Sequence, residues 1–289
     1  MDNNQPSFMD SLHVSSESIK GPFFMIVTGL ANVGKTGLCL SAPDPFFVSL
    51  ESGTDWIPAP KFVDGNKKPI IPKNVDQFFD MLKWLLNKNN RERLDKPVKT
   101  VVIDSLGFFE KLVYDKVIQE HPLTDGKNPR PVYSIVDLGF DGMGWPMDYW
   151  HTLLASVNAF KSRGINVIMI THTLWVNIIS PDGKSYKQLG MALQVYGKHN
   201  VPELLSRASD FVYNMAMETE LITIGKGSWS KNVALGTRSS NTIVTTRQTP
   251  LFFAKTRAIN ETKIPDNYVY DLDNRKEVQQ QIFNDILEA

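Results

Sequence analysis

The 289-residue sequence contains a single cysteine, Cys39, so no disulfide bond can form within the chain. Cys39 follows a glycine-rich segment, where a small buried side chain is favoured over a reactive thiol. No apolar run approaches the roughly 18 residues needed to cross a bilayer. The first twenty residues are polar and lack the basic-then-apolar order of a secretory signal. These absences predict a cytoplasmic protein that does not enter a membrane.

The sequence also lacks an excess of charge of either sign. Lysine and arginine together number 31, aspartate and glutamate together number 31, and the formal net charge is zero. Any contact with nucleic acid would have to come from a local basic surface, because the field of the whole molecule is close to balanced. Hydrophobic residues make up 42% of the chain, which is enough for a large core and argues against global disorder.

In place of these features the sequence has an alternation of strand and helix patterns. Short runs that are apolar at nearly every position are typical of strands buried on both faces of a sheet. Segments with helical spacing of apolar residues lie between them. The alternation predicts an α/β fold with a central, mostly parallel sheet and helices on both faces. The expected strands are 23–27, 46–50, 98–103 and 167–170, and the expected helices are 37–41, 75–86, 108–119 and 149–161.

The pattern changes after about residue 209. Short segments, several alternating apolar with polar residues, are joined by turns rich in glycine, asparagine and serine. They predict antiparallel strands added to the C-terminal side of the same sheet, at 210–217, 221–225, 232–235, 242–246 and 251–255. Two long segments, 121–146 and 173–200, are expected to be functional or mobile loops. The expected organisation is a flexible tail at 1–20, one core at 21–275 and a C-terminal helix at 276–289.

A phosphate-binding motif follows the first predicted strand. The segment Gly29-Leu30-Ala31-Asn32-Val33-Gly34-Lys35-Thr36 has the form G-x-x-x-x-G-K-[ST], and the helix pattern that follows includes Gly37. The glycines let successive N–H groups point at phosphate oxygens, while Lys35 reaches the β- and γ-phosphates and Thr36 offers its hydroxyl to Mg²⁺. Asn32 stands where many such loops have glycine, and asparagine tolerates a left-handed backbone. The motif predicts a site for ATP and Mg²⁺.

Two carboxylates follow strands that neighbour this motif in the chain. Asp104 ends the run Val101-Val102-Ile103-Asp104 and is predicted to hold Mg²⁺ in the Walker B role. A helix N-cap at Asp104 or Ser105 is the alternative. Glu51 follows the second strand, at the sheet edge where parallel sheets bind ligands. It is interpreted either as the residue that orients the water attacking the γ-phosphate or as a solvated strand-end residue.

A histidine ends the fourth predicted strand, in Ile170-Thr171-His172-Thr173. His172 is predicted to sense the γ-phosphate by donating a hydrogen bond. A buried structural histidine is the alternative interpretation.

These motifs, in this order, resemble the RecA-like ATPase core. More narrowly, the chain resembles phage-encoded, AAA-type nucleotide-binding proteins related to RecA that act as single-strand annealing proteins. The resemblance covers roughly residues 22–260 and rests on Gly29–Thr36, Leu50-Glu51-Ser52-Gly53, Ile103-Asp104-Ser105, Thr171-His172-Thr173 and Ala254-Lys255-Thr256-Arg257. It implies a homo-oligomer, either a ring or a filament, with the nucleotide at the subunit interface. It also implies a location in the cytoplasm of a bacterial host.

The resemblance implies further site residues. Lys255 and Arg257 would act as fingers on a neighbouring subunit's nucleotide, and a solvated basic strand face is the alternative. The segments 121–146 and 173–200 would bind single-stranded DNA, with a single-strand binding protein as a possible partner. Cations interleaved with aromatic rings suit single strands, although ordinary surface composition is the alternative. The nucleic-acid candidates are Lys184, Lys187, Lys198, Tyr186, Trp175 and Arg130.

Three functions are compatible with these features. The first is an ATP-hydrolysing protein that acts on single-stranded DNA in recombination or annealing. The second is a DNA-binding module in which ATP gates assembly with little turnover, and Glu51, Lys255 and Arg257 distinguish it from the first. The third is a P-loop kinase for a small molecule, which the absence of an arginine-rich lid and the late antiparallel strands disfavour.

Overall fold

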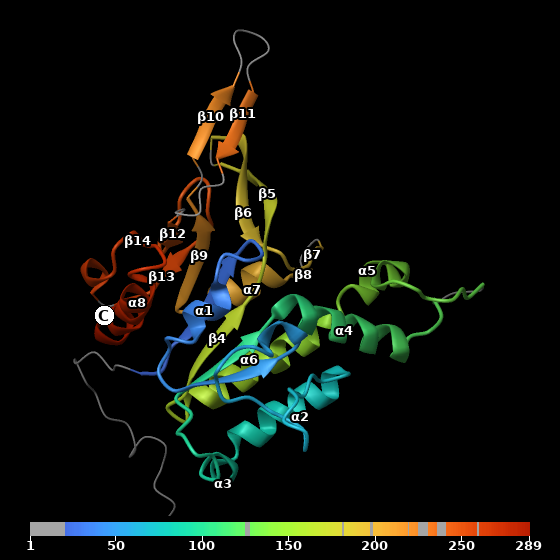
Figure 1. Cartoon of the computed structure of the whole chain (residues 1–289). Helices are drawn as coiled ribbons and strands as arrows, with labels where there is room; N and C mark the ends of the chain where they lie inside the picture. Colours follow the sequence, from blue (N-terminus) through green and yellow to red (C-terminus); the bar gives the residue numbers. More distant parts are fainter. Residues whose placement is uncertain are drawn as a thin grey trace, which may run out of the picture.

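The computed structural model describes residues 21–124, 128–180, 182–196, 199–218, 220–224, 231–235, 241–258 and 260–289. A central sheet is built from β1 (Phe24–Gly29), β2 (Pro45–Ser49), β3 (Thr100–Asp104), β4 (Asn166–Ile170), β9 (Phe211–Met217), β12 (Thr242–Thr245), β13 (Lys255–Thr256) and β14 (Asn267–Tyr270). The strands lie in the order β14-β12-β9-β1-β4-β3-β2, and β13 also pairs with β9 (Figure 1). All positions of β1, β3 and β4 are buried, as expected of strands covered on both faces.

The direction of the strands divides the sheet into two parts. The strands β9, β1, β4, β3 and β2 all run parallel to one another. The strands β12 and β13 run antiparallel to β9, and β14 runs antiparallel to β12. The predicted α/β fold, with a mostly parallel sheet extended by antiparallel strands from the C-terminal part of the chain, is therefore confirmed.

Three expected strands differ from the prediction in direction or in the sheet to which they belong. The segment 210–217 forms β9, which is parallel to β1 and not antiparallel. The reason is a short helix, α7 (Val201–Ala208), which precedes β9 and acts as a crossover connection. The segments near 221–225 and 232–235 form β10 (Glu220–Ile224) and β11 (Lys231–Leu235), which make a separate two-stranded sheet that projects from the central one (Figure 1).

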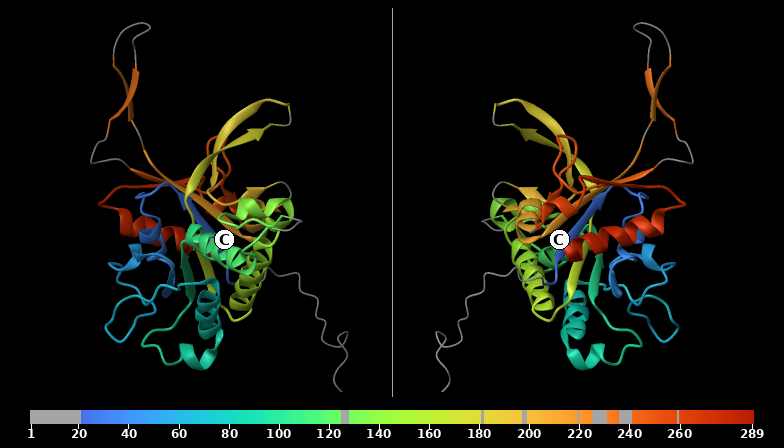
Figure 2. Two further views of the ribbon diagram at one scale, coloured as in Figure 1. Left: turned by 90° about the vertical axis from the view of Figure 1, so that its right-hand side faces the viewer. Right: turned by 90° about the vertical axis from the view of Figure 1, so that its left-hand side faces the viewer.

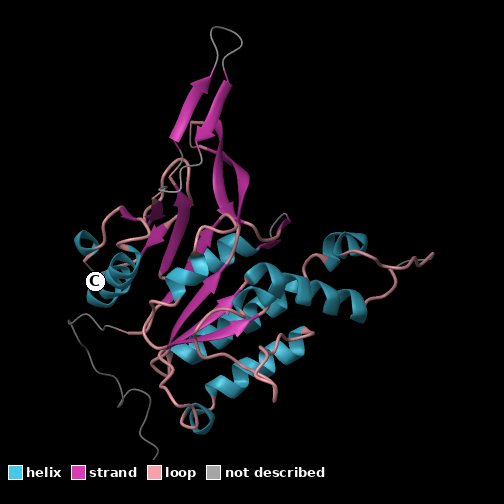
Figure 3. Ribbon diagram, viewed as in Figure 1, coloured by secondary structure: helices cyan, strands magenta, loops and turns pink. Residues whose placement is uncertain are grey.

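Helices cover both faces of the sheet (Figure 3). The helices on one face are α2 (Val75–Leu86), α4 (Leu106–Glu120) and α6 (Pro146–Lys161), and those on the other are α1 (Lys35–Cys39) and α8 (Arg275–Glu288). On the first face Phe109 packs between Phe78 and Trp150, with ring centroids 5.0 and 4.9 Å apart. On the second face Phe23 stacks on Phe283 of α8 at 6.4 Å. Cys39 is fully buried on this face, and burial raises the pKa of its thiol, as expected of a core residue.

The segment 173–200 is not the structureless loop that was predicted. It contains a regular hairpin of β5 (Thr173–Ile179) and β6 (Ser185–Met191), followed by the short strands β7 (Val195–Tyr196) and β8 (His199–Asn200). The prediction was wrong because the turn between Ser180 and Lys184 was interpreted as part of a long loop. There the Ser180 N–H donates to the Lys184 carbonyl at 2.8 Å, which joins two strands that pair along their whole length. Figure 2 shows the hairpin, in yellow, projecting from the body of the molecule.

The remaining elements are short. The helix α3 (Lys88–Arg91) follows α2, and the segment 121–146 contains a 3-10 helix at Ile135–Leu138 and α5 (Gly139–Gly142). Further 3-10 turns lie at Ser52–Thr54 and Glu261–Lys263. Among the described residues, no helix is both long enough and apolar enough to cross a membrane.

Candidate nucleotide site

The loop that joins β1 to α1 has a backbone that depends on glycine and asparagine. Gly29 has a φ of 155°, and a Cβ added there would lie 2.4 Å from the carbonyl oxygen of Met215 on β9. Gly34, the N-cap of α1, has a φ of 90°, and Asn32 has a φ of 62°. Left-handed values are rare for most other residues, so the asparagine serves in place of a third glycine, as predicted. The loop can therefore turn its N–H groups toward one ligand.

Lys35 lies under this loop. Its Nζ donates to the carbonyl oxygens of Gly29 at 3.0 Å and Leu30 at 2.7 Å, and the residue is only 7% exposed. Burial lowers the pKa of Lys35, and the nearby carboxylates of Asp104 and Glu51 oppose that shift. The ammonium is thus held at the loop by groups that phosphate oxygens can replace.

Thr36 and Asp104 meet at the carboxyl ends of β1 and β3. The Thr36 hydroxyl donates to Oδ2 of Asp104 at 2.9 Å, and Asp104 is 4% exposed. Burial raises the pKa of Asp104 to about 6, helped by the charge of Glu51 and opposed by the Thr36 hydrogen bond and by Lys35. A hydroxyl and one carboxylate side by side are ligands that Mg²⁺ accepts when phosphates and water complete its coordination.

These two side chains fit the predicted Mg²⁺ better than a metal bound by protein alone. Among the described residues, no group of three or more histidine, cysteine, aspartate or glutamate side chains is arranged to hold a metal ion. A site with a single carboxylate has the composition expected for a metal that arrives with a nucleotide.

Strand β4 places His172 beside Lys35. Because β4 lies between β1 and β3 in the sheet, the residue that follows it comes next to the loop. The distance from His172 Nδ1 to Lys35 Nζ is 3.4 Å. Partial desolvation and the charge of Lys35 lower the pKa of His172, so the neutral imidazole is favoured. His172 is an exposed residue, and the alternative of a buried structural histidine does not describe it.

Glu51 lies two residues beyond the end of β2, at the same edge of the sheet. Its Oε1 accepts a hydrogen bond from the Ser105 hydroxyl at 3.4 Å. Ser105 is the N-cap of α4, yet its side chain makes no cap hydrogen bond. The structure therefore brings Glu51 to the end of β3 through Ser105, whose only expected role was that of a helix cap. The Asp104-Ser105 pair was the signal that could have found this contact.

The structure places Lys255 and Arg257 near the amino-terminal ends of the parallel strands, opposite to the nucleotide site. The strand β13 pairs with Phe211 and Val212 at the start of β9, whereas the nucleotide site lies beyond the strand ends. Lys255 Nζ donates to the carbonyls of Ser206 and Ser209, each at 2.6 Å. The two cations therefore do not join Lys35 within one chain, and their predicted contact with a neighbour's nucleotide stays a prediction.

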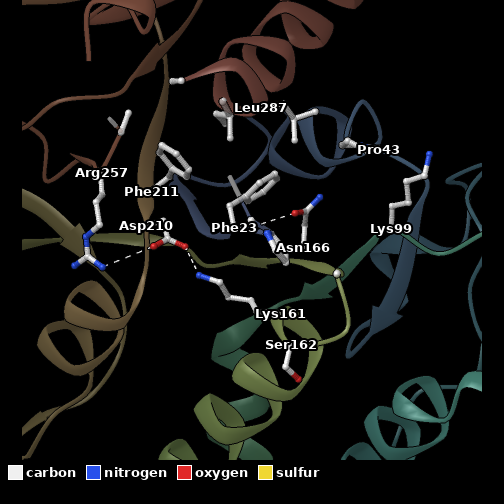
Figure 4. A pocket seen from close by; sticks show the side chains of 16 residues that line it. Phe23, Pro43, Lys99, Lys161, Ser162, Asn166, Asp210, Phe211, Arg257 and Leu287 are labelled. Atoms are coloured by element: carbon white, nitrogen blue, oxygen red, sulfur yellow. Dashed lines mark hydrogen bonds and ion pairs between the residues drawn. The ribbon is translucent and has the colours of Figure 1, made fainter. Parts of the chain in front are cut away.

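Arg257 lines a pocket of about 950 Å³ at this amino-terminal edge (Figure 4). Its Nη1 lies 3.7 Å from Asp210, whose other carboxylate oxygen accepts hydrogen bonds from Lys161 at 2.6 Å and from the Phe24 N–H at 2.8 Å. Asp210 is thus the centre of a network of two ion pairs and a hydrogen bond that connects α6, β1 and the residue after β13.

The nucleic-acid candidates are divided between two segments and two faces. Trp175 on β5 and Lys187 on β6 share a face of the hairpin, because Lys187 is directly opposite Asn177, two residues beyond Trp175. Tyr186 is opposite Ile178 and lies on the other face. Lys184 lies in the turn and is paired with Asp182 at 3.2 Å. Arg130 is exposed in the segment between α4 and α6, and Lys198 lies outside the described residues.

Comparisons with known proteins identify the family of the chain. A family model described as an AAA domain, AAA_24, matches residues 22–258. Among solved structures, the chain is similar to the flagellar accessory protein FlaH from Methanocaldococcus jannaschii, with 10% identity, a TM-score of 0.35, and coverage of 88% of this chain and 87% of that chain. No curated protein matches the chain. The family match spans most of the sequence and includes Gly29–Thr36, so the chain belongs to the AAA_24 family of AAA domains and has a P-loop NTPase fold.

Proposed function

We propose that this protein binds ATP with Mg²⁺ and hydrolyses it. The observation that carries the proposal is the gathering of Lys35, Thr36, Asp104, Glu51 and His172 at one edge of the sheet, from four different strand ends. Lys35 would exchange its two loop carbonyls for β- and γ-phosphate oxygens, and Thr36 and Asp104 would hold Mg²⁺. Bound there, Mg²⁺ would neutralise phosphate charge.

Glu51 and His172 have separate roles in hydrolysis. The oxygen of a water molecule attacks the γ-phosphorus, the bond to the β–γ bridging oxygen breaks, and the proton of that water passes toward Glu51. The carboxylate is oriented by the Ser105 hydroxyl. His172 donates a hydrogen bond to the γ-phosphate as a neutral imidazole, in keeping with its lowered pKa. Its contact distance to Lys35 supports this role.

We further propose that the protein acts on single-stranded DNA, in recombination or annealing of a RecA-like kind. The supporting observation is that the β5–β6 hairpin begins at the residue after His172 and exposes Trp175 beside Lys187 on one face. An exposed indole can stack on a base while a neighbouring lysine contacts the backbone phosphate. The Ala192 N–H also donates to the His172 carbonyl at 2.8 Å, so the base of the hairpin contacts the nucleotide site directly.

The first experiment is ATP hydrolysis with and without single-stranded DNA, using Lys35→Ala and Glu51→Gln beside the wild type. Turnover that DNA stimulates, and that Glu51→Gln lowers by about 10²-fold or more while ATP still binds, is the expected result. Lys35→Ala is expected to lose ATP binding itself.

The same experiment decides between this function and an ATP-gated binding module. If the wild type binds ATP and DNA but its slow turnover is unchanged in Glu51→Gln, the enzymatic proposal is wrong and ATP acts only as a ligand. If ATP is hydrolysed but DNA neither stimulates turnover nor is retained, the DNA proposal fails and the ATPase proposal stands.

A further inference from the structure

The outer edge of β5 has backbone groups that no other part of the described chain satisfies. At the two ends of the hairpin the Ala192 N–H donates to the His172 carbonyl and the Ser180 N–H donates to the Lys184 carbonyl. In an antiparallel pair the hydrogen-bonded residues alternate, so the even-numbered residues of β5 bond to β6. The odd-numbered residues Trp175, Asn177 and Ile179 therefore direct their N–H and C=O groups away from β6.

The matching edge of β6 is covered at Leu189, and that of β5 is not covered at any of the three residues. The Leu189 N–H donates to the Leu251 carbonyl at 2.8 Å, and the Phe253 N–H donates to the Leu189 carbonyl at 3.1 Å. On β5, no group of the described residues makes a hydrogen bond with the outward backbone of Trp175, Asn177 or Ile179. The edge is also rich in exposed apolar side chains, with Trp175 56% and Ile179 76% exposed.

This edge lacks the features that usually prevent one strand from pairing with another. Proteins protect free edges with charged residues, proline, bulges or a covering loop. The strand Thr173–Ile179 contains no charged residue and no proline, and it pairs with β6 at all seven positions without a bulge. A strand of this kind is a template for an added strand.

We propose that the outer edge of β5 pairs with the same edge of a second copy of this chain, antiparallel and centred on Val176. In this register Val176 lies opposite the same residue of the second copy, Leu174 opposite Ile178, and Trp175 opposite Asn177. The outward N–H and C=O groups of Trp175 then bond with those of Asn177 in the second copy. The two-fold symmetry makes Asn177 bond with Trp175 of the second copy in the same way. The result is a four-stranded sheet with the order β6-β5-β5-β6.

The chemistry of the strand favours a second copy over other occupants. Because β5 has no charge, self-pairing places no like charges opposite each other. The pairs on the Leu174, Val176 and Ile178 face are all apolar, and such pairs stabilise sheets. A nucleic-acid backbone would find no cation on this strand. A nucleic-acid backbone also has no N–H donors that could pair with the carbonyl groups of the strand. The DNA face proposed above, Trp175 beside Lys187, consists of side chains perpendicular to this edge, so the two proposals are independent.

The first test is the mass of the full-length protein in solution without nucleotide, by light scattering after size exclusion. The expected mass is twice 32.6 kDa. Asn177→Pro removes an outward N–H and leaves the bonds to β6, which proline tolerates on an edge strand. It is expected to give a single-chain mass with an unchanged far-ultraviolet circular dichroism spectrum. A single-chain mass for the wild type, or a dimer that persists in a folded Asn177→Pro variant, overturns the proposal.

A cysteine variant tests the register without disturbing the fold. In a non-hydrogen-bonded antiparallel pair the Cα atoms are about 4.5 Å apart, which is within the range of a disulfide. Val176→Cys is therefore expected to form a disulfide-linked dimer under mild oxidation, and Asn177→Cys, which faces Trp175 in this register, to form much less. The natural Cys39 is buried and does not compete. Absence of the Val176→Cys crosslink, or equal crosslinking of both variants, contradicts the proposed pairing.

Discussion

The ammonium of Lys35 and the imidazole of His172 lie 3.4 Å apart, although 137 positions separate them in the chain. Their contact exists because β4 lies between β1 and β3, which brings the residue after β4 to the phosphate loop. The carbonyl of the same histidine accepts a hydrogen bond from Ala192 at the end of the β5–β6 hairpin. A single residue, His172, therefore connects Lys35 to the hairpin.

The pKa of His172 predicts how stability depends on pH. Its pKa is lowered from the usual value of 6.5 by partial desolvation and by Lys35, so the unfolded chain binds the proton more readily than the folded protein. The stability that the neutral imidazole contributes is present above about pH 6.5 and is lost as the pH falls toward the folded pKa. We expect the fall in unfolding free energy between about pH 7.5 and about pH 5.5 to be smaller in His172→Asn than in the wild type. Urea unfolding at both pH values measures it, and an equal or larger fall in the variant contradicts the prediction.

Because Gly29 approaches β9 closely, we expect a substitution at Gly29 to lower stability more than the same substitution at other glycines of this segment. A methyl group at Gly29 would lie 2.4 Å from the Met215 carbonyl oxygen, so the backbone of β1 or β9 would have to move. We expect Gly29→Ala to lower the free energy of unfolding by about 1–3 kcal/mol.

Gly37 provides the matched control for this substitution. An added Cβ at Gly37 meets nothing within 4 Å, and the residue is helical. Gly37→Ala is expected to leave stability unchanged or to raise it by about 0.5–1 kcal/mol. Thermal or urea unfolding of the two variants checks the contrast, and a Gly29→Ala protein as stable as Gly37→Ala would show that the contact relaxes without cost.

The buried carboxylate of Asp104 predicts a conflict between stability and metal binding. Burial raises the pKa of Asp104 to about 6, so the folded protein holds this proton more tightly than the unfolded chain does. The stabilisation from the proton is complete below the pKa of the unfolded chain, and it is lost as the pH rises to about 6. Asp104→Asn removes the charge and keeps an acceptor for the Thr36 hydroxyl. At about pH 7.5 we expect the variant, free of nucleotide, to be more stable by about 1–3 kcal/mol.

The same substitution is expected to weaken Mg²⁺-dependent ATP binding, because one of the two proposed metal ligands becomes neutral. Urea unfolding and ATP titrations with and without Mg²⁺ measure the two effects. A destabilised variant that binds ATP and Mg²⁺ normally would mean that Asp104 is structural.

The two faces of the β5–β6 hairpin predict different effects on DNA binding. Replacing Trp175 by alanine removes the exposed ring on the Lys187 face and is expected to weaken binding of single strands by about 1–3 kcal/mol. Tyr186→Ala, on the opposite face, is the control and is expected to have little effect. Lys187→Ala is expected to reduce the slope of log affinity against log salt concentration by about 1, which corresponds to the loss of one phosphate contact. Fluorescence anisotropy with a labelled oligonucleotide measures all three, and equal losses for Trp175→Ala and Tyr186→Ala would contradict the proposed face.

The amino-acid sequence predicted those parts of the fold that depend on local chemistry. Four of the five parallel strands were recognisable because each is a short run of apolar residues, and the order of helices and strands in that part of the chain followed from that pattern. The helix 75–86 was predicted with the bounds that the structure shows. The left-handed conformation of Asn32 was also predicted, since it depends on the residue type and its neighbours alone.

Local patterns were insufficient where pairing decided the structure. The segments 210–217 and 221–235 have similar alternating patterns, yet the first is a central parallel strand and the second is a separate hairpin. The hairpin at 173–191 was interpreted as a loop because its turn contains residues typical of loops. For 210–217 the partner strand β1 is far away in the chain, and for the two hairpins the choice between strand and loop depends on a pairing that the pattern within one strand does not specify.

The sequence by itself determined that a phosphate-binding loop follows a buried strand, because the loop's conformation and the charge of Lys35 are properties of consecutive residues. Only the tertiary structure decided which distant groups meet there. The strand order brought Asp104, Glu51 and His172 to the loop, and it placed Lys255 and Arg257 at the other end of the strands. Strand order and register depend on the packing of the whole sheet, which buries its apolar faces in one arrangement, and no single segment contains that information.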